Sequence, residues 1–573
     1  MVANVRRVTI AIFVLWLVLF LVVLPSLVRD AYAGTGIGFL NQMFESRRSN
    51  SLDHYMTSLR ILAAVGGIGI LGAGFGLIAA IRDAARGSPV ARRFVLPAAP
   101  TSLAGIRIAV VGVALVIALL EDPSSTALLP RWSEAPYGLG LVKIVRRVPG
   151  IEALLSSAGA LMALKLFTVG ALVLALVGLF TRFALVAAVA GGLVLGAVLR
   201  MYTHFFHTGL LPLYLLVVLC FCRCADAWSI DAVLRRRAGK PVPPPERPSM
   251  EYGWGRFVCW SVVALTYFAA GTSKLRHGGF LWWDGVNLKS KLLADVLQVN
   301  SIELPWTPLI GELPVAVFSI LGLGTLIIEA GFPAVLFSRT ARFLFPLGAA
   351  GLHLGVFLMQ EILFLDLMLI QILFFDVRKP AAYLEQRFRS RFPALALAGP
   401  SDSTSAGPEE QRAETGALAP VPLGTLLLAV FPVVYCGTIA LGLEAYPITT
   451  WSMYSDRTQS TRVQYILFHG LDAAGRKVPV RFEDAFGVLH FNRAYDIVPR
   501  AFHDEDGQRP LRQMLDAFAG IRDRERSAGE RLSAFQFDLR AWDYARDPGD
   551  PNRGVTVSTF VHRIGSAASA EKP

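Results

Sequence analysis

Residues 159–180 read GALMALKLFTVGALVLALVGLF, and residues 182–199 read RFALVAAVAGGLVLGAVL. Each is an apolar run close to the roughly 20 residues that a helix needs to cross the hydrocarbon core of a bilayer. Comparable runs occur along most of the chain, at 8–28, 59–81, 104–120, 208–224, 258–275, 312–336, 341–358, 361–376 and 421–442. The sequence therefore predicts a polytopic α-helical membrane protein with about eleven transmembrane helices, several of them short.

The charge content of the chain supports the same conclusion. Of its 573 residues, 54% are hydrophobic and 17% are charged, whereas a soluble globular chain carries about 25% charged residues. The formal net charge is +12, but the basic residues lie mostly in short loops beside the apolar runs, where membrane topology places them. We therefore expect the lipid bilayer as a partner and no binding of nucleic acid.

The basic residues also predict an orientation. Arg6 and Arg7 precede the first apolar run, which is long for the core of a signal peptide, so we interpret it as an uncleaved first span. The alternative is a signal peptide cleaved near Ala31-Tyr32-Ala33. With the N-terminus in the cytoplasm, the loops on that side carry more Arg and Lys than the opposite loops. This predicts a multi-pass protein of a bacterial inner membrane, with its C-terminal domain outside the cytoplasm.

Changes in composition predict the domain organisation. Residues 399–420 are rich in Gly, Ser, Pro, Ala and Glu, and we expect them to be disordered. After the last apolar run, the patterns at 463–468, 511–524 and 555–561 predict a strand, a helix and a closing strand. The expected parts are two N-terminal transmembrane helices with their loops at 1–95, a helical membrane domain at 96–380, a disordered cytoplasmic linker at 381–420, a last transmembrane helix at 421–442 and a small α+β extracytoplasmic domain at 443–573.

Ionisable residues inside the apolar runs are the first candidates for function. Each costs a few kcal/mol to place in a bilayer, so we treat each as a functional candidate. With the predicted orientation, basic groups from three runs fall at one depth near the extracytoplasmic side, which indicates a pocket that opens outward. The candidates are Lys165, His204, His207, Lys274, Glu329, His353, Glu361 and Asp366.

Each candidate also has a simpler structural explanation. Lys274 could extend its amine to the membrane interface, and His204 and His207 could belong to an interfacial aromatic belt, as could Trp282. His353 could form an interhelical hydrogen bond, and Glu329 could pair with a neighbouring helix. Nothing in the spacing fixes the geometry of a metal site, so no metal is predicted.

One stretch carries a family resemblance. The segment YFAAGTSKL at 267–275, followed by Gly279, Trp282 and Gly285, resembles the vitamin K-dependent γ-glutamyl carboxylase family, whose bacterial relatives are grouped as the horizontally transferred transmembrane domain, HTTM. The resemblance extends to His207 with its following Leu210-Leu211, to Glu329-Ala330-Gly331-Phe332 and to the run carrying His353. It covers about residues 100–380.

The resemblance implies a specific chemistry. Lys274 corresponds to the base that deprotonates a reduced naphthoquinone of the vitamin K or menaquinol type, and His207 lies near that site in the family. Oxygen then converts the quinone into a strong base, which takes a proton from a peptidyl glutamate before carbon dioxide adds. We expect Glu329, His353, His204 and Trp282 to shape the pocket. The first of the family's paired lysines is replaced here by Ser273, and the domain that holds the peptide substrate in the family is larger.

These observations give two hypotheses of function. The first is a quinol- and oxygen-dependent membrane enzyme of the carboxylase (lyase) type, acting on an extracytoplasmic peptide or protein. The second is a non-enzymatic membrane scaffold or partner-binding protein built on the same helical bundle, which supports assembly or partner binding through the extracytoplasmic tail. A transporter is less favoured because the sequence has no paired inverted repeats. The motif from Tyr446-Pro447 to Trp451-Ser452-Met453-Tyr454 follows the last predicted span, and we expect it to fasten the tail to the membrane surface.

Overall fold

The computed structural model describes most of the helical bundle and most of the C-terminal region. The described residues are 2–37, 95–128, 157–200, 207–297, 307–360, 362–375, 446–480, 505–524 and 530–565, with shorter pieces and single residues at 41, 52–53, 55–57, 59–60, 63–64, 67, 150, 431–432, 434–439, 498, 502 and 526–527.

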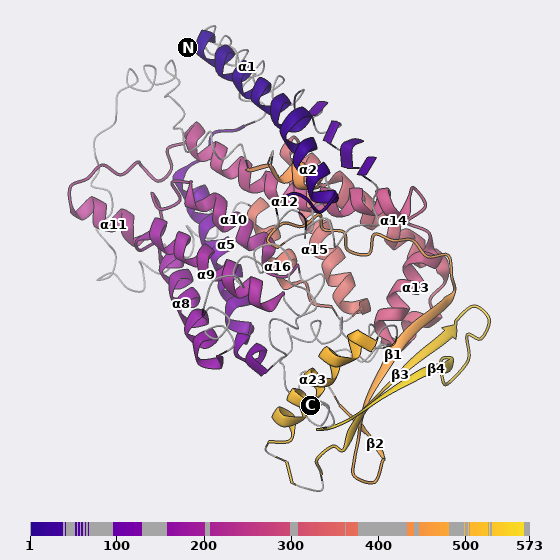
Figure 1. The fold of residues 1–573 in the computed structure, drawn as a ribbon. Coiled ribbons are helices and arrows are strands. Elements are labelled where there is room, and N and C mark those ends of the chain that lie inside the picture. The colour runs from indigo at the N-terminus through magenta and orange to yellow at the C-terminus, as the bar shows by residue number, and fades with distance from the viewer. Residues whose placement is uncertain are drawn as a thin grey trace.

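Among the described residues, helices make up the first part of the chain and the strands lie near its end (Figure 1). The helical elements are α1 (Val2–Val18), η1 (Leu19–Val23), α2 (Leu24–Tyr32), α5 (Pro100–Leu120), η3 (Pro123–Leu128), α8 (Ala158–Val177), α9 (Thr181–Leu199), α10 (Leu210–Cys220), α11 (Ile230–Arg237), α12 (Met250–Gly278), α13 (Gly285–Val296), η5 (Thr307–Glu312), α14 (Val315–Gly331), η6 (Phe332–Leu336), α15 (Ala341–Gln360), α16 (Leu365–Leu369), η7 (Ile370–Phe374) and α23 (Glu505–Arg522).

Six helices within the described residues are long and apolar enough to cross a membrane. They are Thr9–Tyr32, Pro100–Leu120, Ala158–Val177, Thr181–Leu199, Val315–Leu336 and Ala341–Gln360. Their outer faces carry exposed apolar side chains such as Phe183, which is 81% exposed, as expected for helices whose solvent is lipid. The prediction of a mostly helical chain with several helices able to span a membrane is therefore confirmed.

The predicted count of eleven spans is not confirmed. The runs at 208–224 and 361–376 form shorter apolar helices, Leu210–Cys220 and Leu365–Phe374. The run at 258–275 lies inside the 29-residue helix α12, which is not among the six candidates because polar and charged residues interrupt its apolar character. Most of 59–81 and 421–442 lies outside the described residues, although 431–432 and 434–439 are helical.

Helix α12 forms the centre of the bundle. Its residues Cys259, Val262, Val263 and Ala264 have no exposed surface, and they belong to one apolar core with residues of α5, α8, α9 and α10. Burial of side chains along most of its length is typical of a helix surrounded by other helices. The central position of α12 explains why polar residues in it find partners on several neighbouring elements.

The C-terminal region contains a small antiparallel sheet with the strand order β2-β1-β3-β4. Its strands are β1 (Arg462–Leu471), β2 (Lys477–Pro479), β3 (Ala534–Asp543) and β4 (Val555–Arg563). One face packs against α23, where Phe468 stacks on Phe537 of the neighbouring strand at 4.5 Å. The opposite face contacts α13 through Leu293 and Leu297. Figure 1 shows this sheet at the side of the bundle where α13 lies, far from α11.

Candidate functional site

A buried ion pair joins the two helices that carry the family-like motifs. Lys274 lies near the end of α12 and Glu329 near the end of α14. The Nζ atom of Lys274 is 3.0 Å from Oε1 and 2.9 Å from Oε2 of Glu329. The two side chains are only 5% and 8% exposed. Each charge therefore has its counter-charge within hydrogen-bonding distance, which is the condition for keeping both in a low-dielectric interior.

A glycine one turn before Lys274 allows this pair to form. A Cβ atom on Gly271 would lie 2.5 Å from the backbone nitrogen of Ala330, the residue after Glu329. Helices α12 and α14 thus touch through their backbones at this level, as small residues permit in membrane bundles. The close approach brings the two charged side chains together.

Trp282 covers the ion pair. Its side chain is 1% exposed, and Nζ of Lys274 lies 5.4 Å from the centroid of its ring. The indole Nε1 donates a hydrogen bond of 2.8 Å to the carbonyl oxygen of Tyr454. Trp282 is therefore an interior residue whose aromatic face lies beside the ammonium group, an arrangement that favours the cation electrostatically.

The segment that contains Tyr454 enters the bundle rather than lying on the membrane surface as expected. Trp451 is 1% exposed and belongs to the main core, and its ring nitrogen donates a hydrogen bond to Tyr435 Oη. Farther along, the hydroxyl groups of Ser455 and Ser273 are 2.8 Å apart. We call residues 446–460 the tail insert. In the sequence, the signal that this segment enters the bundle is its aromatic residues, which follow neither a helical nor a strand periodicity. They do not reveal which residues of the bundle it contacts.

His207 contacts the tail insert. Its Nε2 atom is 3.1 Å from the hydroxyl group of Thr449, and its ring stacks on Trp451 with 4.9 Å between centroids. His207 is 4% exposed and lies just before α10. The structure thus joins His207 and Lys274 through two parts of the same insert, Thr449–Trp451 and Tyr454–Ser455.

His353 belongs to a separate hydrogen-bonded cluster on α12. Its Nε2 atom is 2.8 Å from the hydroxyl group of Tyr267, which also accepts a hydrogen bond of 2.8 Å from Gln371. Tyr267 precedes Lys274 by seven residues, about 10 Å along the helix. The cluster therefore ties α12, α15 and η7 together, as expected for an interhelical hydrogen bond.

The remaining predicted candidates lie elsewhere or outside the described residues. Asp366 is fully buried and accepts a hydrogen bond of 2.7 Å from the backbone of Gly209, which ties α16 to the start of α10. Lys165 bonds to carbonyl groups at the end of α5. His204 and Glu361 lie outside the described residues. Within the described residues, no group of three His, Cys, Asp or Glu side chains could hold a metal ion.

Sequence reasoning missed a carboxylate on the neighbouring helix α13. Asp295 Oδ2 accepts hydrogen bonds from Tyr454 Oη at 3.0 Å and from Gln360 Nε2 at 2.8 Å. Burial raises the pKa of Asp295 to about 6, although both hydrogen bonds act in the opposite direction. On the same helix, Lys291 Nζ donates to the carbonyl oxygen of Tyr454 at 3.2 Å. Asp295 thus links the tail insert to the membrane helix α15.

With this geometry established, the chain was compared with known proteins. The comparisons with protein-family models, with curated proteins and with solved structures found no match. The function is therefore inferred from the site itself. The site contains a buried amine and a buried carboxyl group about 3 Å apart, a distance at which a proton can pass between them.

Proposed function

We propose that this chain is an integral membrane enzyme that resembles the vitamin K-dependent carboxylases, with Lys274 as its base and a reduced naphthoquinone and oxygen as co-substrates. The observation that carries the proposal is the buried Lys274–Glu329 pair. An intramembrane lysine with a carboxylate partner is expensive to maintain and typical of functional sites. The proposal includes a cytoplasmic N-terminus and an extracytoplasmic C-terminal domain in a bacterial inner membrane.

Proton transfer within the pair can produce a neutral, basic amine on Lys274. In a low-dielectric site, the transfer of one proton from Lys274 to Glu329 removes two buried charges, and this gain offsets much of the lost attraction. The neutral amine that results is a proton acceptor. Glu329 would hold the proton, and Lys274 would take another from the substrate.

The residues around the pair fit a reduced naphthoquinone in chemical type. When bound, this group supplies an acidic ring hydroxyl and reducing electrons. Lys274 would accept the hydroxyl proton, and Trp282, whose ring lies 5.4 Å from Lys274 Nζ, offers an aromatic face to a planar ligand. His207 and the tail insert would exclude water from the outer side. We also propose peptidyl glutamate as the acceptor to which carbon dioxide is added. This part rests on the family resemblance alone.

The test measures quinone chemistry in the complete protein. In lipid nanodiscs, wild-type protein should convert reduced naphthoquinones to their epoxides in an oxygen-dependent reaction, and Lys274→Ala and Glu329→Gln should lose this activity. Lys289→Ala is a matched control because Lys289 is also buried, at 7% exposure, but donates to the carbonyl oxygen of Leu313. Absence of both turnover and quinol binding in the folded wild-type protein would overturn the proposal.

A second function, a non-enzymatic scaffold, is favoured by how completely the pair is enclosed. Both oxygens of Glu329 lie within 3.0 Å of Lys274 Nζ, and Trp282 and the tail insert cover the pair. A closed, neutral pair of this kind also fits a purely structural contact between two helices. In that case quinol would not bind, and replacing the pair by apolar residues would leave partner binding intact.

A further inference from the structure

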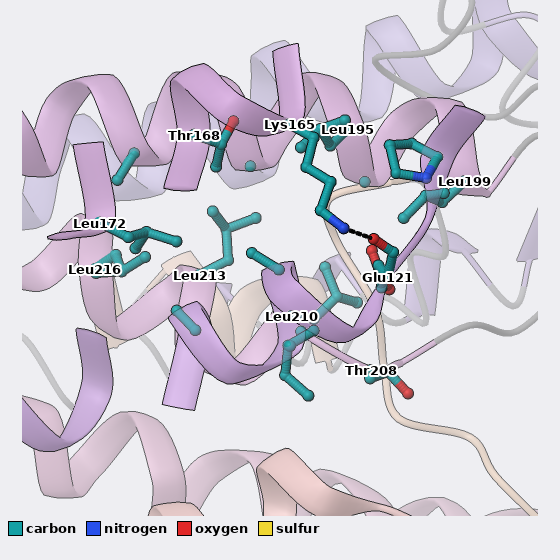
Figure 2. A pocket seen from close by; sticks show the side chains of 18 of the residues that line it. Glu121, Lys165, Thr168, Leu172, Leu195, Leu199, Thr208, Leu210, Leu213 and Leu216 are labelled. Carbon is teal, nitrogen blue, oxygen red and sulfur yellow. Dashed lines mark hydrogen bonds between the residues drawn. The ribbon is translucent and has the colours of Figure 1, made fainter. Parts of the chain in front are cut away.

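The tail insert is fixed at its two ends by different parts of the molecule. At its start, Tyr446 lines a cavity of about 80 Å³ between α5, α8, α9 and α10, the cavity beside Lys165 in Figure 2. The Tyr446 hydroxyl group donates a hydrogen bond of 2.9 Å to the carbonyl oxygen of Leu193 in α9. At its end, Ser290 of α13 donates a hydrogen bond of 2.7 Å to the carbonyl oxygen of Ser460, two residues before β1 begins. The middle of the insert is therefore held between the helical bundle and the sheet.

Tyr454, in the middle of the insert, has an unfavourable backbone conformation. Its φ angle is 53°, in the left-handed region that glycine adopts readily and bulky residues rarely adopt. In this conformation its carbonyl oxygen accepts two hydrogen bonds, from Trp282 Nε1 at 2.8 Å and from Lys291 Nζ at 3.2 Å. Such a conformation persists only where the surrounding structure enforces it, and residues of this kind cluster at functional sites.

The side chain of Tyr454 supplies part of this enforcement. Its hydroxyl group donates a hydrogen bond of 3.0 Å to Asp295 Oδ2, and its ring centroid lies 6.0 Å from Nζ of Lys291. Lys291 and Asp295 are four residues apart on α13, so they lie on the same face of that helix. Tyr454 is therefore attached to α13 through both its side chain and its carbonyl group.

The tail insert holds Trp282 at two points. The first is the hydrogen bond from the indole to Tyr454. The second runs through Asn287, which has no exposed surface: its Nδ2 donates to the carbonyl oxygen of Trp282 at 2.7 Å, and its Oδ1 accepts from the backbone nitrogen of Thr458 at 3.0 Å. On the side of α12, a Cβ atom on Gly278 would lie 2.4 Å from Cδ1 of Trp282. The indole thus has a single position, between the insert and a glycine of α12.

We propose that Tyr454 is a positioning residue of the Lys274 site, whose left-handed backbone directs its carbonyl group to hold Trp282 over Lys274. Trp282 is the residue through which it acts, since the indole ring lies 5.4 Å from Lys274 Nζ. A shift of the ring would uncover the amine and remove the aromatic face beside it. The role in a reaction rests on the proposed quinol chemistry, whereas the role in holding the cover over the amine does not.

Two variants of Tyr454 separate the backbone from the ring. Tyr454→Val and Tyr454→Gly both remove the ring and its hydroxyl group, but valine disfavours the left-handed conformation and glycine adopts it readily. In nanodiscs, acetic anhydride acetylates accessible amines, and mass spectrometry measures the rate at each lysine. Acetylation of Lys274 should be about tenfold faster in Tyr454→Val than in wild type, and within about threefold of wild type in Tyr454→Gly.

Lys289 is the internal control in each sample. It is buried at 7% exposure and donates to the carbonyl oxygen of Leu313 instead of the insert, so its rate of acetylation should be the same in all three proteins. Equal rates at Lys274 in Tyr454→Val and Tyr454→Gly would overturn the proposal. Rates that rise together at Lys274 and Lys289 would show a general loosening of the fold and would overturn it as well.

Quinol turnover distinguishes this proposal from the proposed function. Tyr454→Val should form epoxide about tenfold more slowly than wild type, with Tyr454→Gly restoring most of the rate. Turnover that is the same in wild type and Tyr454→Val would contradict a positioning role in the reaction. Wild-type protein without turnover, together with faster acetylation of Lys274 in Tyr454→Val alone, would reject the quinol chemistry and keep Tyr454 as the residue that positions Trp282.

Discussion

Two lysines of the helical bundle show that a positive charge can be stabilised in two different ways. Lys274 has its counter-charge on another helix, 2.9 Å away, and a tryptophan over it. Lys165 donates to backbone carbonyl groups at the end of α5 and lines a cavity. The first charge is neutralised by its partner, whereas the second is stabilised by a helix end whose dipole favours cations. The comparison indicates that Lys274 suits internal proton transfer, whereas Lys165 suits the fixing of one helix end against another helix.

The largest expected effect is at Lys274. Lys274→Ala leaves the Glu329 carboxylate buried without its partner, and removing one member of a buried pair costs about 3–5 kcal/mol. Replacing both residues, as in Lys274→Met with Glu329→Leu, should restore most of the stability. Unfolding titrations in mixed detergent micelles measure both values. Equal destabilisation by the single and the double variants would show that the pair is not the source of the effect.

The close approach of α12 and α14 should produce the next largest effect. Gly271→Ala places a methyl group 2.5 Å from the Ala330 nitrogen, and overpacking of this kind costs about 1–3 kcal/mol. The helices must separate, so the ion pair should lengthen and turnover should fall. Gly324→Ala on α14, where a Cβ meets no atom within 4 Å, is the matched control. Similar unfolding midpoints for the two variants would contradict the proposed contact.

Lys165 should matter less than Lys274 for stability. Lys165→Met removes charge-assisted hydrogen bonds to the end of α5, worth about 1–3 kcal/mol, but leaves no carboxylate without a partner there. The same unfolding titration should therefore show a smaller loss than Lys274→Ala. A loss as large as that of Lys274→Ala would mean that the two lysines are held in the same way.

A smaller, pH-dependent effect is expected at Asp295. Its pKa is about 6 in the folded protein and about 3.9 in an unfolded chain, so folding takes up a proton between these values. Stability should therefore fall as the pH rises from about 4 to about 6, since the folded state binds more protons there. Comparing Asp295→Asn with wild type across this range isolates the effect, because the amide does not titrate. An unchanged pH profile in Asp295→Asn would assign the slope to other groups.

The sequence predicted the long apolar helices well because length and hydropathy determine them locally. The predicted number of spans is not confirmed within the described residues, where α10 and α16 with η7 are short and α12 combines an apolar core position with Lys274, Ser273 and Thr272. Strand β1 was predictable from the alternation at Val463–Phe468. Elements with strong periodicity can thus be found without knowledge of their neighbours.

The candidate site was predictable only in part. Lys274, Glu329, His207 and Trp282 were identified one by one, but the pairing of Lys274 with Glu329 spans 55 residues, and no local pattern specifies it. The contact between the tail insert and α12 joins residues still farther apart in the sequence, since Ser455 and Ser273 are separated by 182 residues. Such contacts arise from the packing of the whole bundle. The cavity beside Lys165 depends on how four helices leave space between them, which a single run of sequence does not record.

The most direct test of the account measures epoxide formation in nanodiscs by the double variant Lys274→Met/Glu329→Leu, which lacks both charges. The wild-type protein is measured beside it under conditions in which both proteins are folded. The account predicts oxygen-dependent conversion of a reduced naphthoquinone by the wild-type protein and none by the stable double variant. Equal turnover by both proteins would show that the buried pair only joins two helices, and would contradict the assignment of Lys274 as the base.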